Sequence, residues 1–400
     1  MDSLKGRSTW WLDARPWILL GLLQIPSIRN YLVSSSLPSP LLIWGLVSLG
    51  ILAGSYLFFH QPKVRTLAGR ILQSRLTTLA LLAAFALASY LLYPRFEGLG
   101  RGGTGDDALV LPIQTLLRGE GLYSVRLFDG APVSPGMGWL LANGLFVVSG
   151  TFGLMNTAYM GIAALLAAYR HPARIFPINA SLACMLVSFA AIEQIYSRQD
   201  LLAIGWAFLM CGLLIEDHLN LRNAAWIGLL TGLAATARII FLYFPLILVV
   251  IYWKKDARAA LQFGLTAGIT ALAWHAAGIL LSNFYQPLHL LLDRGPNRVG
   301  IWLILTGGLA MLGGLILALR DPQGTGRRRF RWLALLTGLP LALISLGELL
   351  SGGIDFAQWE AARYLLPGLP IALFALFAPA AESAKTGPPL SQVVQTMPDV

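Results

Sequence analysis

Long apolar runs are the feature that most constrains this chain. The runs at 40–59, 76–93, 175–195 and 299–319 are each close to the roughly 20 residues that an α-helix needs to cross about 30 Å of hydrocarbon. Hydrophobic residues make up 56% of the 400 residues and charged residues only 12%, whereas a soluble domain carries about a quarter charged residues. We therefore expect an all-α, polytopic helical membrane protein.

The basic loops predict how the chain threads the membrane. Three basic segments, at 60–75, 254–258 and 320–331, are placed in the cytoplasm by the positive-inside rule. With both termini on that side, the sequence predicts about twelve spans. These are expected at 17–35, 39–59, 76–93, 137–169, 175–195, 200–216, 224–238, 240–253, 259–281, 299–319, 332–350 and 364–380. This threading favours a multi-pass protein of a bacterial plasma (inner) membrane, with every lysine on the cytoplasmic side and only arginines as outer cations.

The same threading divides the chain into three parts. Residues 1–16 form a cytoplasmic N-terminus, residues 17–380 form the transmembrane domain, and residues 381–400 form a polar cytoplasmic tail that we expect to be disordered. The longest polar segment, at 94–135, emerges on the outer face. Within it, the apolar positions of residues 106–123 predict a short amphipathic helix at the membrane interface.

Composition also excludes several classes of partner. The net charge of +10 is spread over short loops and forms no basic stripe, so no nucleic-acid partner is expected. The two cysteines lie inside apolar runs, which excludes a disulfide framework or a zinc site. The five histidines lack paired ligand spacing and are interpreted as packing residues.

The outer segment opens with an unusual stretch, "LGRGGTGDDALVLP", at 99–112. Gly100 to Gly105 match G-x-G-x-x-G only formally, because the dinucleotide motif follows a strand and this one follows a membrane helix. One aspartate of the pair Asp106 and Asp107 can cap the helix that follows. Adjacent carboxylates repel, which raises the pKa of one of them and suits a general base. We favour Asp106 as that base and keep Asp107 as the alternative.

The order of features between residues 94 and 376 resembles the GT-C superfamily of integral-membrane glycosyltransferases, which use polyprenyl-phosphate-linked sugars. An acidic pair opens the first large outer loop, and Ser134-Pro135-Gly136 in "GAPVSPGMGWLL" stands where the family has a "PPG"-like turn. The segment "GLLTGLAATAR", at 228–238, is similar to the family's "GLLxGLAxxTK", with Arg238 in place of the lysine that contacts lipid phosphate. "RYLLPGLP", at 363–370, is similar to the "RYxxPxxP" entry of a late span.

This resemblance implies an inverting hexosyl- or pentosyltransferase of the mannosyltransferase-like kind, working in the cell envelope. It would move a sugar from a polyprenyl-phosphate donor to a lipid or glycan acceptor at the outer face, among membrane lipids. Asp106 or Asp107 would take the acceptor proton, and Arg238 and Arg363 would face the lipid phosphate. The remaining candidate substrate-binding residues are Arg126, Arg198, Asp200, Tyr123 and Tyr364.

Two further expectations concern these residues. Arg198 and Asp200 join two spans on the outside, and we expect them to pair with each other, the alternative being that both line one cavity. The two aspartates could hold a divalent cation such as Mg²⁺ or Mn²⁺, but the sequence offers no obvious third ligand. We therefore predict no obligatory metal or other cofactor.

Two other functions compete with this interpretation. A transporter or flippase for a lipid-linked or anionic solute would also use outer arginines and carboxylates within the membrane, although the two halves of the chain show no convincing repeat. An inactive scaffold subunit could retain the fold without the chemistry.

Overall fold

The computed structural model describes residues 13–33, 39–98, 104–127, 130–282, 284–288, 301–321 and 326–378. Across these ranges the regular structure is helical, and the only strand-like feature is an isolated bridge between Arg126 and Pro132. The expected class, a helical membrane protein, is confirmed. Most of the predicted N-terminal segment, the glycine-rich residues 100–103 and the predicted tail at 381–400 lie outside the described residues.

Seven helical segments are long and apolar enough to cross a membrane. They include α3 (Pro40–His60), α5 (Arg75–Gly98), α11 (Leu201–His218), α14 (Ala257–Leu281) and α16 (Gly326–Ser351). A sixth joins the 3₁₀ helix η2 (Phe152–Leu154) to α8 (Met155–Arg170). The seventh combines the 3₁₀ helix η6 (Glu360–Gly368) with α17 (Leu369–Phe377). All seven overlap predicted spans, but the predicted number of twelve is not confirmed, because no other single helix in the described part of the chain meets the same criteria of length and hydropathy.

Three predicted spans are interrupted. The one at 17–35 divides at Pro26 into α1 (Arg15–Gln24) and α2 (Ile28–Val33), since proline lacks an amide donor and restricts the residue before it. The one at 137–169 divides into α7 (Met137–Val148) and α8, separated by Gly150 with a φ of +69° and by η2 (Phe152–Leu154). The one at 175–195 bends by 87°.

The bent segment consists of α9 (Ile175–Met185), preceded by η3 (Pro172–Arg174), and α10 (Phe189–Tyr196). Ser188 caps α10 by accepting a hydrogen bond from the amide of Ala191. Counting the bent pair as one span raises the number of candidates to eight. The remaining helices are α12 (Leu221–Ala235), η4 (Ile239–Leu242), α13 (Tyr243–Tyr252) and α15 (Ile301–Arg320).

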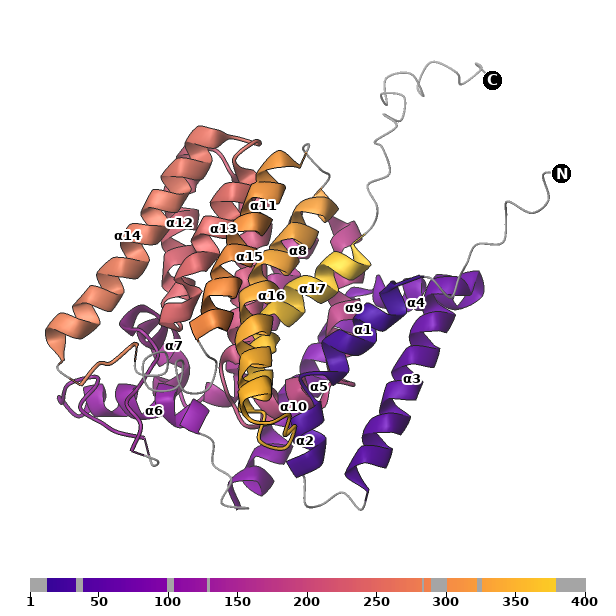
Figure 1. Cartoon of the computed structure of the whole chain (residues 1–400), viewed down its shortest axis with the longest axis horizontal. Helices are drawn as coiled ribbons and strands as arrows, with labels where there is room; N and C mark the ends of the chain where they lie inside the picture. The colour runs from indigo at the N-terminus through magenta and orange to yellow at the C-terminus, as the bar shows by residue number, and fades with distance from the viewer. Residues whose placement is uncertain are drawn as a thin grey trace, which may run out of the picture.

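Two shorter helices lie near opposite ends of the long ones. The amphipathic helix expected after Asp106 is α6 (Thr104–Leu117), and the basic segment at 60–75 contains α4 (Pro62–Leu72). In Figure 1, α6 lies at the lower left, whereas the start of α14 lies at the top and α4 lies on the right at the upper end of α3. This arrangement agrees with the threading in which two basic segments share one face and the long polar segment lies on the other. Which face is cytoplasmic stays a prediction.

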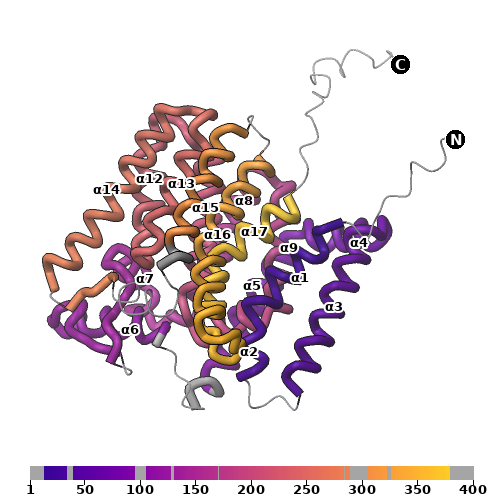
Figure 2. The backbone as a smooth tube through the Cα atoms, viewed as in Figure 1, coloured from indigo at the N-terminus to yellow at the C-terminus, as the bar shows by residue number. Residues whose placement is uncertain are grey.

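Burial distinguishes the centre of the bundle from its rim. In α11, 72% of the apolar window is buried, against 6% in α3. Phe208 of α11 stacks on Phe244 of α13 with ring centroids 3.8 Å apart, and α8, α12, η6 and α17 all contact α11. Figure 2 shows α14 at one edge of the molecule and α3 at the other. The exposed leucines of these outer helices are suited to contact with lipid.

Glycine allows the closest helix pair, α12 and α14, to pack backbone to backbone. A Cβ atom added at Gly232 would lie 2.5 Å from the carbonyl oxygen of Ala267, and one at Gly228 would lie 2.6 Å from that of Phe263. Small residues at helix contacts let membrane helices approach closely. This contact holds α12, which ends at Ala235, three residues before Arg238.

We expect Gly232→Ala to destabilise the protein by about 1–3 kcal/mol, because the added methyl group forces α12 away from α14. The measurement is the thermal unfolding midpoint of the purified protein in detergent. Gly268→Ala is the matched control on α14, since a Cβ there meets nothing within 4 Å, and its midpoint should not fall. Equal losses in both variants would contradict this account of the helix contact.

Candidate active site

Asp106 and Asp107 lie in the first turn of α6, where the partial positive charge of a helix N-terminus stabilises carboxylates. Asp106 is 5% exposed, whereas Asp107 is half-buried. The hydroxyl of Tyr93 on α5 donates to Oδ2 of Asp106 at 3.5 Å. The structure therefore distinguishes the two aspartates, because it is Asp106 that is buried against the end of α5.

The chain before Asp106 approaches the turn between α10 and α11. A Cβ at Gly105 would lie 2.7 Å from Cγ of Gln199, so glycine is needed for this approach. Gln199 is held in turn by Gln194, whose side-chain amide donates to its Oε1 at 2.9 Å. Asn156 of α8 donates to the backbone carbonyls of both Gln194 and Gln199. The turn at 197–200 is thus anchored beside α6.

Arg198 occupies this turn in a strained conformation. Its φ of +57° is uncommon for a residue with a side chain, and such strain often occurs at functional sites. The guanidinium carbon lies 3.5 Å from the ring centroid of Tyr93, a cation–π contact, and the group also packs against Gly153. Tyr93 therefore contacts the carboxylate of Asp106 through its hydroxyl and the guanidinium of Arg198 through its ring.

Asp200 pairs with Arg238, and the predicted pairing of Arg198 with Asp200 is wrong. Nη1 and Nη2 of Arg238 donate to the two carboxylate oxygens of Asp200 at 2.9 and 3.0 Å. The indole of Trp139 donates to the same carboxylate at 2.9 Å. The side chains of Arg238 and Asp200 are 11% and 1% exposed. The reason is geometric, because the left-handed turn directs Arg198 towards α5 while Asp200, at the start of α11, faces the end of α12.

The Ser134-Pro135-Gly136 turn packs against the end of α12, two residues before Arg238. The amide of Gly136 donates to the carbonyl of Thr236 at 2.8 Å, and a Cβ at Gly136 would lie 2.6 Å from that oxygen. The hydroxyl of Tyr123 donates to the carbonyl of Pro135 at 3.0 Å. These bonds hold the start of α7 against the end of α12, which positions Trp139 on Asp200.

Aromatic side chains flank this turn. Tyr123 stacks on Tyr285 with ring centroids 4.3 Å apart, and the Tyr285 hydroxyl lies 2.6 Å from Nδ1 of His275. Burial raises the pKa of both tyrosines above the ordinary value of a phenol. The positive charge of Arg238 lowers the pKa of Tyr285, but by less than burial raises it. Both phenols therefore stay neutral at physiological pH. We name one group of residues the outer cluster, after the predicted threading: Asp106, Tyr93, Arg198, Asp200, Arg238, Trp139, Tyr123 and Tyr285.

Two predicted residues belong to a different group. Arg363 and Tyr364 lie half-buried in η6, and Arg363 together with Arg29 acts electrostatically on Glu193. Glu193 also accepts a hydrogen bond from Asn30 of α2. Helix α10 links the two groups. It carries Glu193 of this second group, and the turn at 197–200, which belongs to the outer cluster, follows its last residue. A role for Arg363 in binding lipid phosphate stays a prediction.

Arg126 lies at the rim of the outer cluster. Its side chain is exposed and its guanidinium carbon is 5.9 Å from the ring centroid of Phe284. In the part of the chain that the structure describes, no three His, Cys, Asp or Glu side chains gather as a metal site would require. The outer cluster contains two carboxylates, and one of them, Asp200, is already bound by Arg238.

Several members of the outer cluster could not be identified in advance. Trp139, Tyr93 and Tyr285 were not predicted, because aromatic residues near the ends of membrane helices are normally interfacial anchors. Trp139 had one signal in the sequence, its place within "GAPVSPGMGWLL" directly after the turn that holds α7. For Tyr93 and Tyr285 we find no signal in the sequence that separates them from other tyrosines.

Comparison of the chain with family models, with curated proteins and with solved structures found no match.

We expect loss of either charge in the Asp200–Arg238 pair to destabilise the protein by about 3–5 kcal/mol, because the partner is left buried and uncompensated. Asp200→Asn, Arg238→Gln and the double variant should be compared by thermal unfolding of the purified protein. The double variant should lose less than the sum of the single losses. Strictly additive losses would contradict the pairing, and Asp355→Asn, at an exposed carboxylate, is the control.

Proposed function

We propose that this chain is a membrane glycosyltransferase that moves a sugar from a polyprenyl-phosphate donor to a lipid or glycan acceptor at the outer face. The observation that carries the proposal is the placement of a buried carboxylate, Asp106, and a cation, Arg198, on opposite parts of one side chain, Tyr93. Glycosyl transfer needs a base for the acceptor hydroxyl and a cation for the donor phosphate, and the two must lie no farther apart than the length of a sugar phosphate.

Asp106 is proposed as the general base. A base must lie within hydrogen-bond reach of the proton that it takes, and the burial of Asp106 beside the polar turn at 197–200 limits competition from water. The Tyr93 hydroxyl lies 3.5 Å from this carboxylate, at the long limit of hydrogen-bond distance. Asp107, half-buried next to it, is assigned to stabilising the start of α6 through the helix dipole.

Arg198 is proposed as the principal cation for the donor phosphate. Its Nε is buried and has no hydrogen-bond acceptor among the described residues, whereas both terminal nitrogens of Arg238 are engaged by Asp200. Guanidinium groups suit phosphate because they offer several N–H donors in one plane. Arg238 is therefore proposed to position the surrounding turns, and to contribute positive potential rather than a direct bond.

The proposed reaction is a single displacement. The acceptor oxygen forms a bond to the anomeric carbon as its proton passes to Asp106. The bond from the anomeric carbon to the phosphate oxygen breaks, and its electron pair leaves with the polyprenyl phosphate. Because that leaving group is already an ionised phosphate, it needs fixed positive charge rather than a general acid. Displacement from the opposite face inverts the anomeric configuration.

The aromatic side of the outer cluster is proposed to hold the transferred sugar or the acceptor. Tyr123 and Tyr285 keep neutral hydroxyls, and their buried, mutually stacked rings form a rigid apolar wall beside hydrogen-bonding groups. Ligand sites commonly combine aromatic walls with a few fixed polar groups. The exposed Arg126 at the rim is placed to meet a charged part of the acceptor.

Asp106→Asn should lower the rate of glycosyl transfer by about 10²–10⁴-fold, since the amide cannot accept the proton, while binding of the donor is retained. The assay measures formation of the glycosylated lipid from a polyprenyl-phosphate sugar by the full-length protein in lipid nanodiscs. Asp107→Asn is the matched control and should keep most of the activity. Full transfer by Asp106→Asn would show that the base is assigned wrongly.

Arg198→Asn should weaken binding of the donor, because it removes the cation while asparagine tolerates the left-handed backbone. Arg126→Asn, at the exposed rim, is the comparison. Binding is measured by displacement of a labelled polyprenyl phosphate from the nanodisc-embedded protein. Unchanged donor affinity in Arg198→Asn, with normal thermal stability, would remove Arg198 from the proposed phosphate site.

One observation favours the second candidate, a flippase or transporter for a lipid-linked or anionic solute. Transporters often form their binding sites at broken helices, and the 87° bend between α9 and α10 lies just before the turn that carries Arg198 and Asp200. The two functions separate in sealed vesicles. A flippase would move the polyprenyl-phosphate sugar across the membrane without forming a glycosidic bond, whereas the glycosyltransferase forms that bond on the outer face.

A further inference from the structure

We propose that a second lipid site, distant from the outer cluster, binds an anionic phospholipid from the leaflet that borders α4. The site consists of an apolar groove between α3 and α9 and a small basic pocket on α4. It is independent of the proposed glycosyl transfer.

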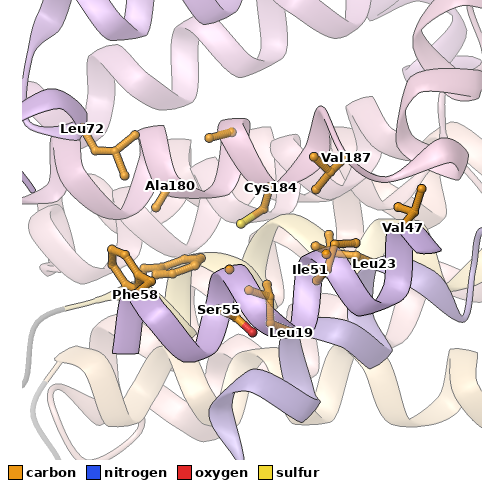
Figure 3. Close-up of a pocket in the computed structure, with 14 residues that line it drawn as sticks. Leu19, Leu23, Val47, Ile51, Ser55, Phe58, Leu72, Ala180, Cys184 and Val187 are labelled. Atoms are coloured by element: carbon orange, nitrogen blue, oxygen red, sulfur yellow. The ribbon is translucent and has the colours of Figure 1, made fainter. Parts of the chain in front are cut away.

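The apolar groove has a volume of about 450 Å³, which is in the range of ligand-binding pockets, roughly 300–1,000 Å³. Figure 3 shows Val47, Ile51 and Phe58 of α3 along one wall and Ala180 and Cys184 of α9 along the other. The side chains that line it are almost entirely hydrocarbon. A groove of this composition suits an acyl chain.

Two glycines on the α3 wall leave extra room in the groove, because they carry no side chain. Gly50 and Gly54 line the groove, and a Cβ added at either would meet nothing within 4 Å. The space beside them is therefore available to a chain running along the helix. Larger side chains at these positions would occupy that space without displacing any backbone.

The basic pocket lies on α4 and has a volume of about 370 Å³. Arg65 and Arg70 line it together with Thr66, Gln73 and the ring of Phe176. Both arginines are exposed, and neither forms an ion pair with a carboxylate in the described parts of the chain. Two uncompensated guanidinium groups beside a hydroxyl and an amide match a phosphate group.

The groove and the pocket meet at one end. Leu72 lines the groove and the next residue, Gln73, lines the pocket. Phe58 of the groove stacks on Phe176 of the pocket with ring centroids 6.2 Å apart. In Figure 3, Leu72 and Phe58 lie at one end of the groove and Val47 and Val187 lie at the other. A single amphiphile can therefore place its phosphate at Arg65 and Arg70 and extend its chain towards Val47.

The position of α4 favours a bilayer phospholipid as the occupant. Val64, Leu67 and Ile71 of α4 are exposed, and a helix with exposed apolar residues on one face and cations on the other lies at a membrane surface. In Figure 1, α4 lies at the opposite end of the molecule from α6. A lipid whose phosphate reaches α4 therefore places its headgroup far from Asp106. A sugar donor that reacts at Asp106 must place its phosphate near that residue, so it is not the occupant of this site.

The test is native mass spectrometry of the full-length protein, released from nanodiscs that contain phosphatidylglycerol and phosphatidylcholine in equal amounts. The wild type should retain phosphatidylglycerol in preference to phosphatidylcholine. Arg65→Gln/Arg70→Gln should weaken that retention by about 10- to 30-fold, given roughly 1 kcal/mol for each cation near anionic lipid. Lys63→Gln, on the same helix but outside the pocket, should leave it unchanged.

Gly54→Leu tests the groove separately, because it should block the chain while leaving both arginines in place. Gly45→Leu, on α3 outside the groove and equally free of neighbours, is its control. Equal retention of the two lipids by the wild type would overturn the proposal. So would unchanged retention in either the arginine or the Gly54 variant, or displacement of the lipid by inorganic phosphate alone.

Discussion

The buried ion pair between Asp200 and Arg238 is the interaction on which the end of the bundle that carries α6 depends. It joins the start of α11 to the end of α12, and Trp139 adds the start of α7 to the same carboxylate. Each charge would be costly to bury alone, so three chain segments are held together at one point. This ion pair helps to position the turn that carries Arg198. It also helps to position the aromatic pair, Tyr123 and Tyr285.

Broken helices are what make room for polar groups at that end. A continuous membrane helix satisfies its own backbone and presents only side chains, whereas the segments before α11 and after α12 end early and expose turns. The Asn156 side chain then donates to the backbone carbonyls of Gln194 and Gln199, and the Gln194 side-chain amide donates to the side-chain oxygen of Gln199. The outer cluster is therefore polar because the helices around it are interrupted there.

Hydrophobicity and length were sufficient to predict the helical class and the long spans, because both follow from the thickness of the bilayer. The break at Gly150 was missed, since hydrophobicity predicts one continuous span on both sides of it. The partner of Asp200 could not be predicted either, because Arg238 lies on another helix and Arg198, only two residues away, was the nearer cation. Asp106 was proposed as a candidate because adjacent carboxylates in an apolar chain are rare, whereas its burial and its contact with Tyr93 arise from tertiary packing.

The central claim is that the outer cluster receives a sugar attached to a polyprenyl phosphate. The most direct measurement is an experimental structure of the protein in nanodiscs with a non-hydrolysable polyprenyl-phosphate sugar analogue. We predict density for the phosphate within hydrogen-bond distance of Arg198 and for the sugar between Asp106 and Tyr285. Headgroup density confined to another part of the molecule, with the outer cluster unchanged by saturating analogue, would contradict the account.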